Sequence, residues 1–187
     1  MIYLFSIEDD NFRQVVQTNS LPYQISWDSL GAFLCTFSNV ESDISIYSSL
    51  GLSKTIYSLK GHTSKILCAK WWPFEGKTFI TKIRLATGSE DSTLKIWDME
   101  EGQCVKELHD HKSAVTSIAF SIDGSMMCTG GQDYTINLYK TEDFVLERTF
   151  NTTGIVLAIS WSPDQNYFSA IYDSFLLIVN VKKVMSN

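Results

Sequence analysis

The sequence predicts an all-β protein built from a repeated four-stranded unit. Three observations predict this class. Apolar residues alternate over many short runs, with almost no helical period, which is typical of half-buried strands. An aromatic residue followed at once by a turn recurs along the chain, at Trp27, Trp71, Phe120 and Trp161. A small-residue run and a second alternating run follow each turn, so that four strands fill a period of about 40 to 45 residues.

Each repeat is expected to contain the same elements in the same order. The first strands are YQISW, ILCAKW, VTSIAF and IVLAISW, and the turns DSLG, WPFEG, SIDG and SPDQ follow them. The second strands are FLCTFS, RLATGS, MMCTGG and YFSAIY, and the third strands are DISIYS, TLKIWD, TINLYK and FLLIVN. A fourth strand is expected in KTIYSLKGH, CVKELHDH and VLERTFNTT. We therefore expect strands of a preceding unit in 1–18, units at 19–60, 61–109 and 110–151, and an incomplete unit at 152–183.

Composition limits the class of protein. The chain has 187 residues, 44% of them hydrophobic, which is enough for one well-buried domain. Its formal net charge of -6 argues against direct nucleic-acid binding, which usually needs a basic surface. No signal peptide and no apolar run of about 20 residues is visible, so no membrane association is expected.

Metal and disulfide chemistry is not expected. Four cysteines, at 35, 68, 104 and 128, lie in strand-like runs without C-x-x-C spacing, which favours buried free thiols and a reducing compartment. His109 and His111 form an H-x-H near Cys104, a weak metal pattern. We interpret them instead as a solvated His109 beside a structural His111. The sequence therefore predicts no metal and no cofactor.

The repeat at 61–109 begins with Gly-His and ends with Trp-Asp, and in both features it resembles the WD40 repeat of β-propeller blades. The resemblance extends along the whole chain. It implies a buried hydrogen-bonded set in which Asp91 orients His62, and Ser89 links that imidazole to the indole of Trp97. Ser89, His62 and Asp91 are also the residue types of a Ser-His-Asp catalytic triad, but the sequence contains no nucleophile elbow or oxyanion loop beside them. The set is thus interpreted as a structural staple, and no enzyme is predicted.

The other repeats carry altered versions of this set. The repeat at 110–151 keeps His111 and Asp133, with Gly131 and Tyr139 in the Ser and Trp positions. The last repeat keeps Asp173, with Asn151-Thr152 for Gly-His and Val179 for Trp. In the first repeat, the corresponding residues are Gln17-Thr18, Glu41 and Tyr47. Only one blade is expected to hold the full set.

The repeats imply an open, partial propeller of about four blades, three of them complete and the last with three strands. Blades normally pack against two neighbours, so the end blades would leave apolar faces uncovered. We expect such a chain to associate through its open blade edges, to be unstable alone, or to belong to a longer protein.

Two departures from the generic repeat suggest a family. The repeat at 61–109 carries extra residues between its first two strands, and the last repeat opens with Thr-Gly-Ile. At Lys70-Trp71-Trp72-Pro73, Thr153-Gly154-Ile155 and Val181-Lys182-Lys183 the chain resembles the transducin β-like corepressor subunits and their yeast relatives. The resemblance implies a nuclear scaffold of a histone-deacetylase complex that contacts deacetylase, corepressor and histone tails. The alternatives are a WD40 adaptor outside chromatin, in trafficking or ubiquitin ligation, and a non-functional truncated paralogue.

Partners of propellers commonly bind where loops converge at one end of the central channel. The repeat places five loop residues there: Lys65, Glu90, Ala114, Gln132 and Tyr172. Among them Glu90 is the strongest candidate, because an exposed acid beside the channel would attract the lysines and arginines of a histone tail.

Overall fold

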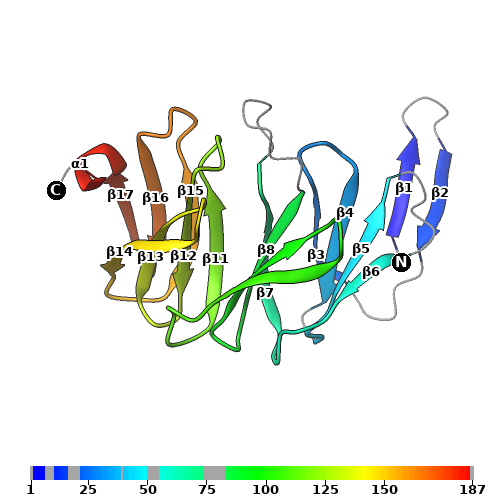
Figure 1. Ribbon diagram of the computed structural model, residues 1–187, viewed down its shortest axis with the longest axis horizontal. Coiled ribbons are helices and arrows are strands. Elements are labelled where there is room, and N and C mark those ends of the chain that lie inside the picture. Colours follow the sequence, from blue (N-terminus) through cyan, green and yellow to red (C-terminus); the bar gives the residue numbers. More distant parts are fainter. Residues whose placement is uncertain are drawn as a thin grey trace.

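A computed structural model describes residues 2–6, 11–16, 22–38, 40–49, 55–73 and 83–185. Within them the strands form five antiparallel sheets that follow one another in chain order, from β1 and β2 at one end to β15–β17 and the helix α1 at the other (Figure 1). Every sheet is a meander, in which each strand pairs with the next one along the chain. The prediction of an all-β, open partial propeller of about four blades is confirmed.

The elements have the following bounds. β1 (Ile2–Ser6) pairs with β2 (Asn11–Val16) alone. Blade I contains β3 (Pro22–Trp27), β4 (Phe33–Ser38), β5 (Ile44–Ser48) and β6 (Thr55–Leu59). Blade II contains β7 (Ile66–Trp71), β8 (Arg84–Ser89), β9 (Leu94–Asp98) and β10 (Gln103–Leu108). Blade III contains β11 (Val115–Phe120), β12 (Met126–Gly131), β13 (Thr135–Lys140) and β14 (Val145–Asn151). Blade IV contains β15 (Val156–Trp161), β16 (Tyr167–Tyr172) and β17 (Phe175–Asn180), followed by α1 (Val181–Met185).

The first strands of the blades lie along the inside of the arc. β3 contacts β7, β7 contacts β11, and β11 contacts β15, so neighbouring blades meet first at these strands. An acid fixes the turn after three of the first strands. Asp28 accepts hydrogen bonds from the backbone N–H of Leu30 (3.1 Å) and Phe33 (2.7 Å). Asp123 and Asp164 accept the N–H of the residue two positions later, at 3.0 and 3.1 Å. This chemistry ends the strand immediately after its aromatic residue.

Neighbouring blades pack through a repeated apolar contact. The third strand of each blade presents two aliphatic side chains to the next blade: Ile44 and Ile46 in blade I, Leu94 and Ile96 in blade II, Ile136 and Leu138 in blade III. The aromatic that ends the next first strand packs into the same core, namely Trp71, Phe120 and Trp161 respectively. Because both faces of an inner blade are covered, all five residues of β9 are buried.

Hydrogen bonds reinforce two of these junctions. The indole of Trp71 donates to the carbonyl of Ser26 in blade I (2.9 Å), and that of Trp161 donates to the carbonyl of Ala119 in blade III (3.1 Å). Each acceptor is the residue just before the aromatic of the preceding first strand. Phe120 has no N–H to donate, so the junction between blades II and III depends on packing at this position.

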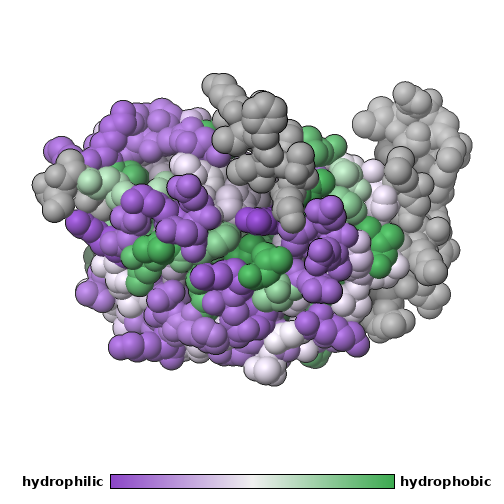
Figure 2. Space-filling view, in the orientation of Figure 1, coloured by the Kyte–Doolittle hydropathy of each residue, from purple (hydrophilic) through white to green (hydrophobic). Residues whose placement is uncertain are grey.

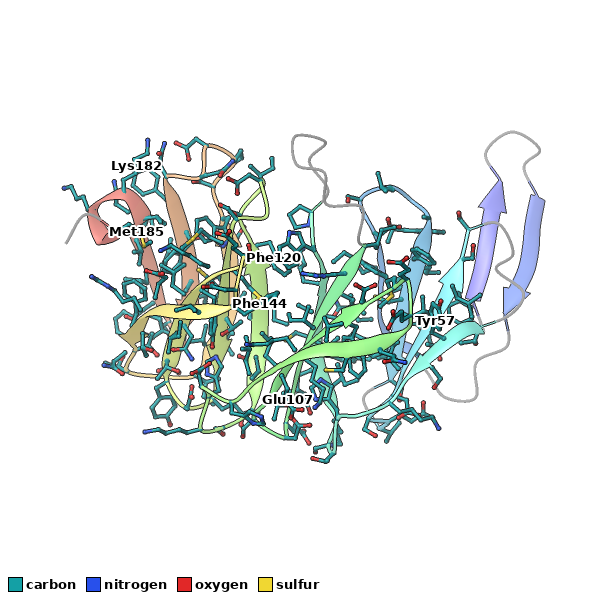
Figure 3. All side chains as sticks on the ribbon, viewed as in Figure 1. Tyr57, Glu107, Phe120, Phe144, Lys182 and Met185 are labelled. Atoms are coloured by element: carbon teal, nitrogen blue, oxygen red, sulfur yellow. The ribbon has the colours of Figure 1, made fainter. Side chains whose placement is uncertain are left out.

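Trp72 fills the junction where that hydrogen bond is missing. Its ring stacks on Phe120 and meets Phe144 edge-on, with ring centroids 5.5 Å apart in both cases, and these two phenylalanines are labelled in Figure 3. Gly124, at φ +69°, makes room for the ring, since a Cβ there would clash with the indole nitrogen. Most of the predicted insertion that follows, residues 74–82, lies outside the described residues.

The prediction of four buried thiols is wrong in part. All four cysteines are free, but only Cys35 and Cys128 are buried, whereas Cys68 is half-buried and Cys104 is exposed. Cys104 lies on β10, the edge strand of blade II, which pairs with β9 on one side only among the described strands.

We expect Leu138→Ala to lower the free energy of unfolding by about 2 to 5 kcal/mol, because it opens a cavity between blades III and IV. Val105 lies on β10, the edge strand of blade II, and is 48% exposed, so Val105→Ala is the control, with an expected change within about 0.5 kcal/mol. Urea unfolding of both variants measures the difference. Equal losses would show that the aliphatic pair does not join the blades.

Candidate functional site

A chain of four polar groups runs through the interior of blade II. The indole of Trp97 donates to the hydroxyl of Thr87 (2.8 Å), and Nε2 of His62 lies 2.8 Å from the same oxygen. Nδ1 of His62 lies 2.9 Å from Oδ2 of Asp91. The indole can only donate, so a neutral imidazole that accepts from Thr87 and donates from Nδ1 satisfies every group. We call this set the blade II staple.

The predicted role of Ser89 in this set is corrected. Its hydroxyl donates to the carbonyl of Ser64 (3.2 Å) and accepts the backbone N–H of Asp91 (3.1 Å), so it closes the turn. The reason is the register of β8 against β9. Trp97 pairs with Leu85, and a large side chain reaches the diagonal neighbour two residues away, which is Thr87. Ser89 is two residues farther along the strand.

The carboxylate of Asp91 anchors the staple. Burial would raise its pKa, but hydrogen bonds from the hydroxyl and N–H of Thr93 and from the N–H of Thr63 prevail and lower the pKa to about 2. Burial lowers the pKa of His62 below its ordinary value of 6.5, although Asp91 opposes that effect. Near neutral pH the staple therefore contains a charged Asp91 and a neutral His62.

Blade III holds a closely similar set that the sequence prediction understated. His111 contacts Asp133 (3.0 Å) and the hydroxyl of Thr129 (2.8 Å), in the same way as its counterpart in blade II. Gly131 therefore does not break the set, because Thr129 supplies the hydroxyl. Tyr139, in the Trp position, is buried and donates to Asp110 (3.2 Å).

The first and last blades differ from these two. Blade I has buried Thr36 and Tyr47 at the Thr and Trp positions, while Glu41 is exposed and its N–H donates to the hydroxyl of Ser38 (3.1 Å). Its Gln17-Thr18 pair lies outside the described residues. In blade IV, Asp173 is exposed and its carboxylate lies against Gly154, a glycine where a Cβ would clash. Ala170 and Val179 occupy the Thr and Trp positions there, so no comparable chain of hydroxyl and indole can form.

The threonines at the Thr position of blades I, II and III share one place in the repeat. Thr36, Thr87 and Thr129 occupy the fourth residue of the second strand in three consecutive repeats. This recurrence was visible in the sequence and would have identified the bridging residue.

The H-x-H pattern of His109 and His111 is explained by an ion pair and a structural hydrogen bond. His109 is largely exposed and lies 3.6 Å from Glu107, which also pairs with the buried Lys95 at 2.5 Å. Glu107 lies at the lower edge of the molecule in Figure 3. Among the described residues, no group of three or more His, Cys, Asp or Glu side chains could hold a metal ion, and no helix is long and apolar enough to cross a membrane.

The predicted partner-binding residues lie just before a first strand (Lys65, Ala114), just after a second strand (Glu90, Gln132) or at the end of one (Tyr172). Lys65 and Glu90 are exposed, 3.9 Å apart, and Glu90 also accepts from the hydroxyl of Ser64 (3.1 Å). Gln132 is exposed and Tyr172 is half-buried against Phe175. Ala114 does not fit the prediction, because it is buried and its carbonyl accepts the N–H of Gln132 (2.8 Å). We call Lys65, Glu90, Gln132 and Tyr172 the channel-end surface, after the position that the repeat pattern predicts for them. Figure 2 shows mainly hydrophilic residues along the lower edge of the molecule.

The chain is similar in sequence to a repeat family and to several known proteins. The family model described as WD domain, G-beta repeat, matches residues 53–98 and 102–140. The chain is 32% identical over 96 residues to Autophagy-related protein 16 of Arabidopsis thaliana, covering 49% of the chain and 19% of that protein. It is 33% identical over 93 residues to Protein Notchless of Drosophila melanogaster, covering 50% of the chain and 18% of that protein. It is 32% identical over 130 residues to Nuclear distribution protein nudF of Aspergillus flavus, covering 67% of the chain and 27% of that protein.

These matches span only part of each relative, between 18% and 27% of its length. They agree with the predicted WD40 repeats. They give no support to the narrower resemblance to the transducin β-like corepressor subunits.

Two substitutions distinguish the hydroxyls of blade II. Thr87→Val should leave the buried indole of Trp97 without an acceptor and cost about 1 to 3 kcal/mol of stability. The indole N–H resonance of Trp97 should shift in this variant. In Ser89→Ala that resonance should stay near its original position, because Ser89 contacts the turn and not the indole. A shift in Ser89→Ala alone would restore the original role of Ser89.

Acid should destabilise the protein in two steps. In the unfolded chain His62 takes up a proton near pH 6.5, whereas in the folded protein it does so only at lower pH. The free energy of unfolding should therefore fall as the pH drops below about 6.5. Asp91 adds a second loss between about pH 3.8 and 2. Melting temperatures measured from pH 7.5 to 4 should decline less steeply below pH 6.5 in His62→Gln than in the wild type. Parallel curves would contradict a lowered pKa for His62.

Proposed function

We propose that this chain, a WD40-repeat protein, is a non-enzymatic scaffold that binds partner proteins. The observation that carries the proposal is that the histidines and aspartates suited to catalysis are hydrogen-bonded inside the blades. Two histidines and two aspartates could serve chemistry, but they are engaged with one another. Asp91 contacts His62 and Asp133 contacts His111, and each imidazole also contacts a buried threonine inside its blade. The serine of the hydrolase alternative closes a turn and does not contact an imidazole. Exposed loop residues remain for recognition.

The channel-end surface is the proposed binding site. Glu90 stands at its edge as an exposed acid, and the whole chain carries a formal charge of -6, so a basic segment is the partner that its charge favours. Lys65 and Ser64 contact this carboxylate in the free protein. A lysine or arginine of the partner would replace Lys65, an exchange between exposed charges with little desolvation cost.

The narrower proposal is a nuclear scaffold of a histone-deacetylase corepressor complex, with histone tails as the basic partner. It is supported by the motifs at Lys70–Pro73, Thr153–Ile155 and Val181–Lys183 and by the acidic residue at the channel end. The second candidate is an adaptor outside chromatin. It is favoured by the names of the relatives, which are an autophagy-related protein and a nuclear distribution protein.

Reversal of the charge at Glu90 tests the binding site. In titrations with a lysine-rich histone-tail peptide, Glu90→Lys should weaken binding several-fold and reduce its dependence on salt. Glu101→Lys makes the same charge change on an exposed turn between β9 and β10 and should leave the affinity near that of the wild type. Equal affinities for all three proteins would exclude this surface.

The same proteins used as affinity baits in a nuclear extract separate the two candidates. Recovery of deacetylase and corepressor subunits with the wild type and Glu101→Lys, but not with Glu90→Lys, would support the corepressor proposal. Recovery of other partners alone would favour the adaptor.

A further inference from the structure

Blade I carries an exposed copy of a surface that is covered in the other blades. In blade II, the fourth and sixth residues of the first strand are Ala69 and Trp71, and both pack against blade I. In blade IV, the same positions hold Ile159 and Trp161, which pack against blade III. The same positions in blade I hold Ile25 and Trp27, which are 57% and 45% exposed. β1 and β2 pair only with each other, and this row of β3 stays uncovered.

Blade IV carries the complementary half of the same interface. Its register places Leu176 and Ile178 where blade III has Ile136 and Leu138, the aliphatic pair that faces the next blade. The blade III pair is fully buried, at 0% exposure, whereas Leu176 and Ile178 are 64% and 63% exposed. The two ends of the chain therefore present the aliphatic pair and the aromatic row that meet inside it.

A hydrogen-bond donor and its acceptor are also present at the two ends. Inside the chain, the aromatic of one blade donates to the carbonyl just before the aromatic of the preceding blade, as Trp71 does to Ser26. The corresponding free donor is Trp27, which has no acceptor within the part of the chain that the structure describes. The corresponding acceptor is the carbonyl of Ser160, on the first strand of blade IV, which the hydroxyl of Ser169 approaches to 3.4 Å.

We propose that two copies of this chain associate head to tail, with blade IV of one copy packed on blade I of the other. Leu176 and Ile178 cover Ile25 and Trp27, and the indole of Trp27 donates to the carbonyl of Ser160 in the other copy. A second copy fits because the contact continues, residue for residue, the interface that joins consecutive blades. Such an interface is heterologous, so each copy uses two different faces.

Two complementary variants test the geometry. Ile25→Asp blocks the blade I face, and Ile178→Asp blocks the blade IV face. Both side chains are exposed, so each variant should melt like the wild-type monomer. Analytical ultracentrifugation should find the wild type above its monomer mass of 21.2 kDa and each variant alone as a monomer. An equimolar mixture retains one intact pair of faces and should form a dimer that grows no further.

The outcomes divide clearly. A wild type that stays monomeric while folded, or a mixture that stays monomeric, would overturn the proposal. So would association of Ile25→Asp alone, which indicates contact between two blade IV faces, or of Ile178→Asp alone, which indicates contact between two blade I faces.

The hydrogen bond has its own test. Trp27→Phe keeps the ring and removes the donor, so self-association should weaken by about tenfold without a change in melting of the monomer. Trp161→Phe removes the same N–H inside the chain, where it should lower the melting temperature and leave the association of folded protein unchanged. Unaltered association in Trp27→Phe would exclude the proposed hydrogen bond between copies.

Discussion

The contact between an aliphatic pair and the aromatic of the next blade is the constraint on which this structure depends. It covers both faces of an inner blade, which explains why all five residues of β9 are buried. It also requires small residues where a first strand begins close to the preceding blade. A Cβ on Gly88 would clash with Val115, and one on Gly130 with Val156. Close packing between blades thus dictates sequence at positions that bind nothing.

The polar staples solve the problem that such packing creates. A blade covered on both faces has little access to water, so a polar group inside it costs free energy unless it finds a partner. Blade II does this with an indole, a threonine, a histidine and an aspartate, and blade III with a tyrosine in place of the indole. In blade IV, alanine and valine occupy the corresponding positions and the need for partners disappears. The variation among the blades is therefore consistent with one physical rule.

Much of the fold could be predicted from the sequence, because alternation, turn residues and a regular period all indicate the same strands. The details that failed depend on three-dimensional register and coverage. Ser89 and Thr87 both carry a hydroxyl on β8, and only the pairing of β8 with β9 decides which of them the indole of Trp97 reaches. The repeat pattern predicts Ala114 in an exposed loop, but Ala114 is buried and its carbonyl accepts the N–H of Gln132. Cys104 alternates like a half-buried residue, yet β10 is an outer strand.

The arrangement of the blades in chain order has a consequence for the way the protein comes apart. Among the described residues, the main contacts of each blade are with the blades before and after it, so cooperativity passes from neighbour to neighbour, as in linear repeat proteins. Blades II and III are each held from two sides, whereas blades I and IV are each held by one neighbouring blade. Local opening therefore begins at the two end blades, and amide protons should exchange with solvent faster there than in the doubly supported β9 and β12. The molecule is a series of linked units whose protection increases toward the middle.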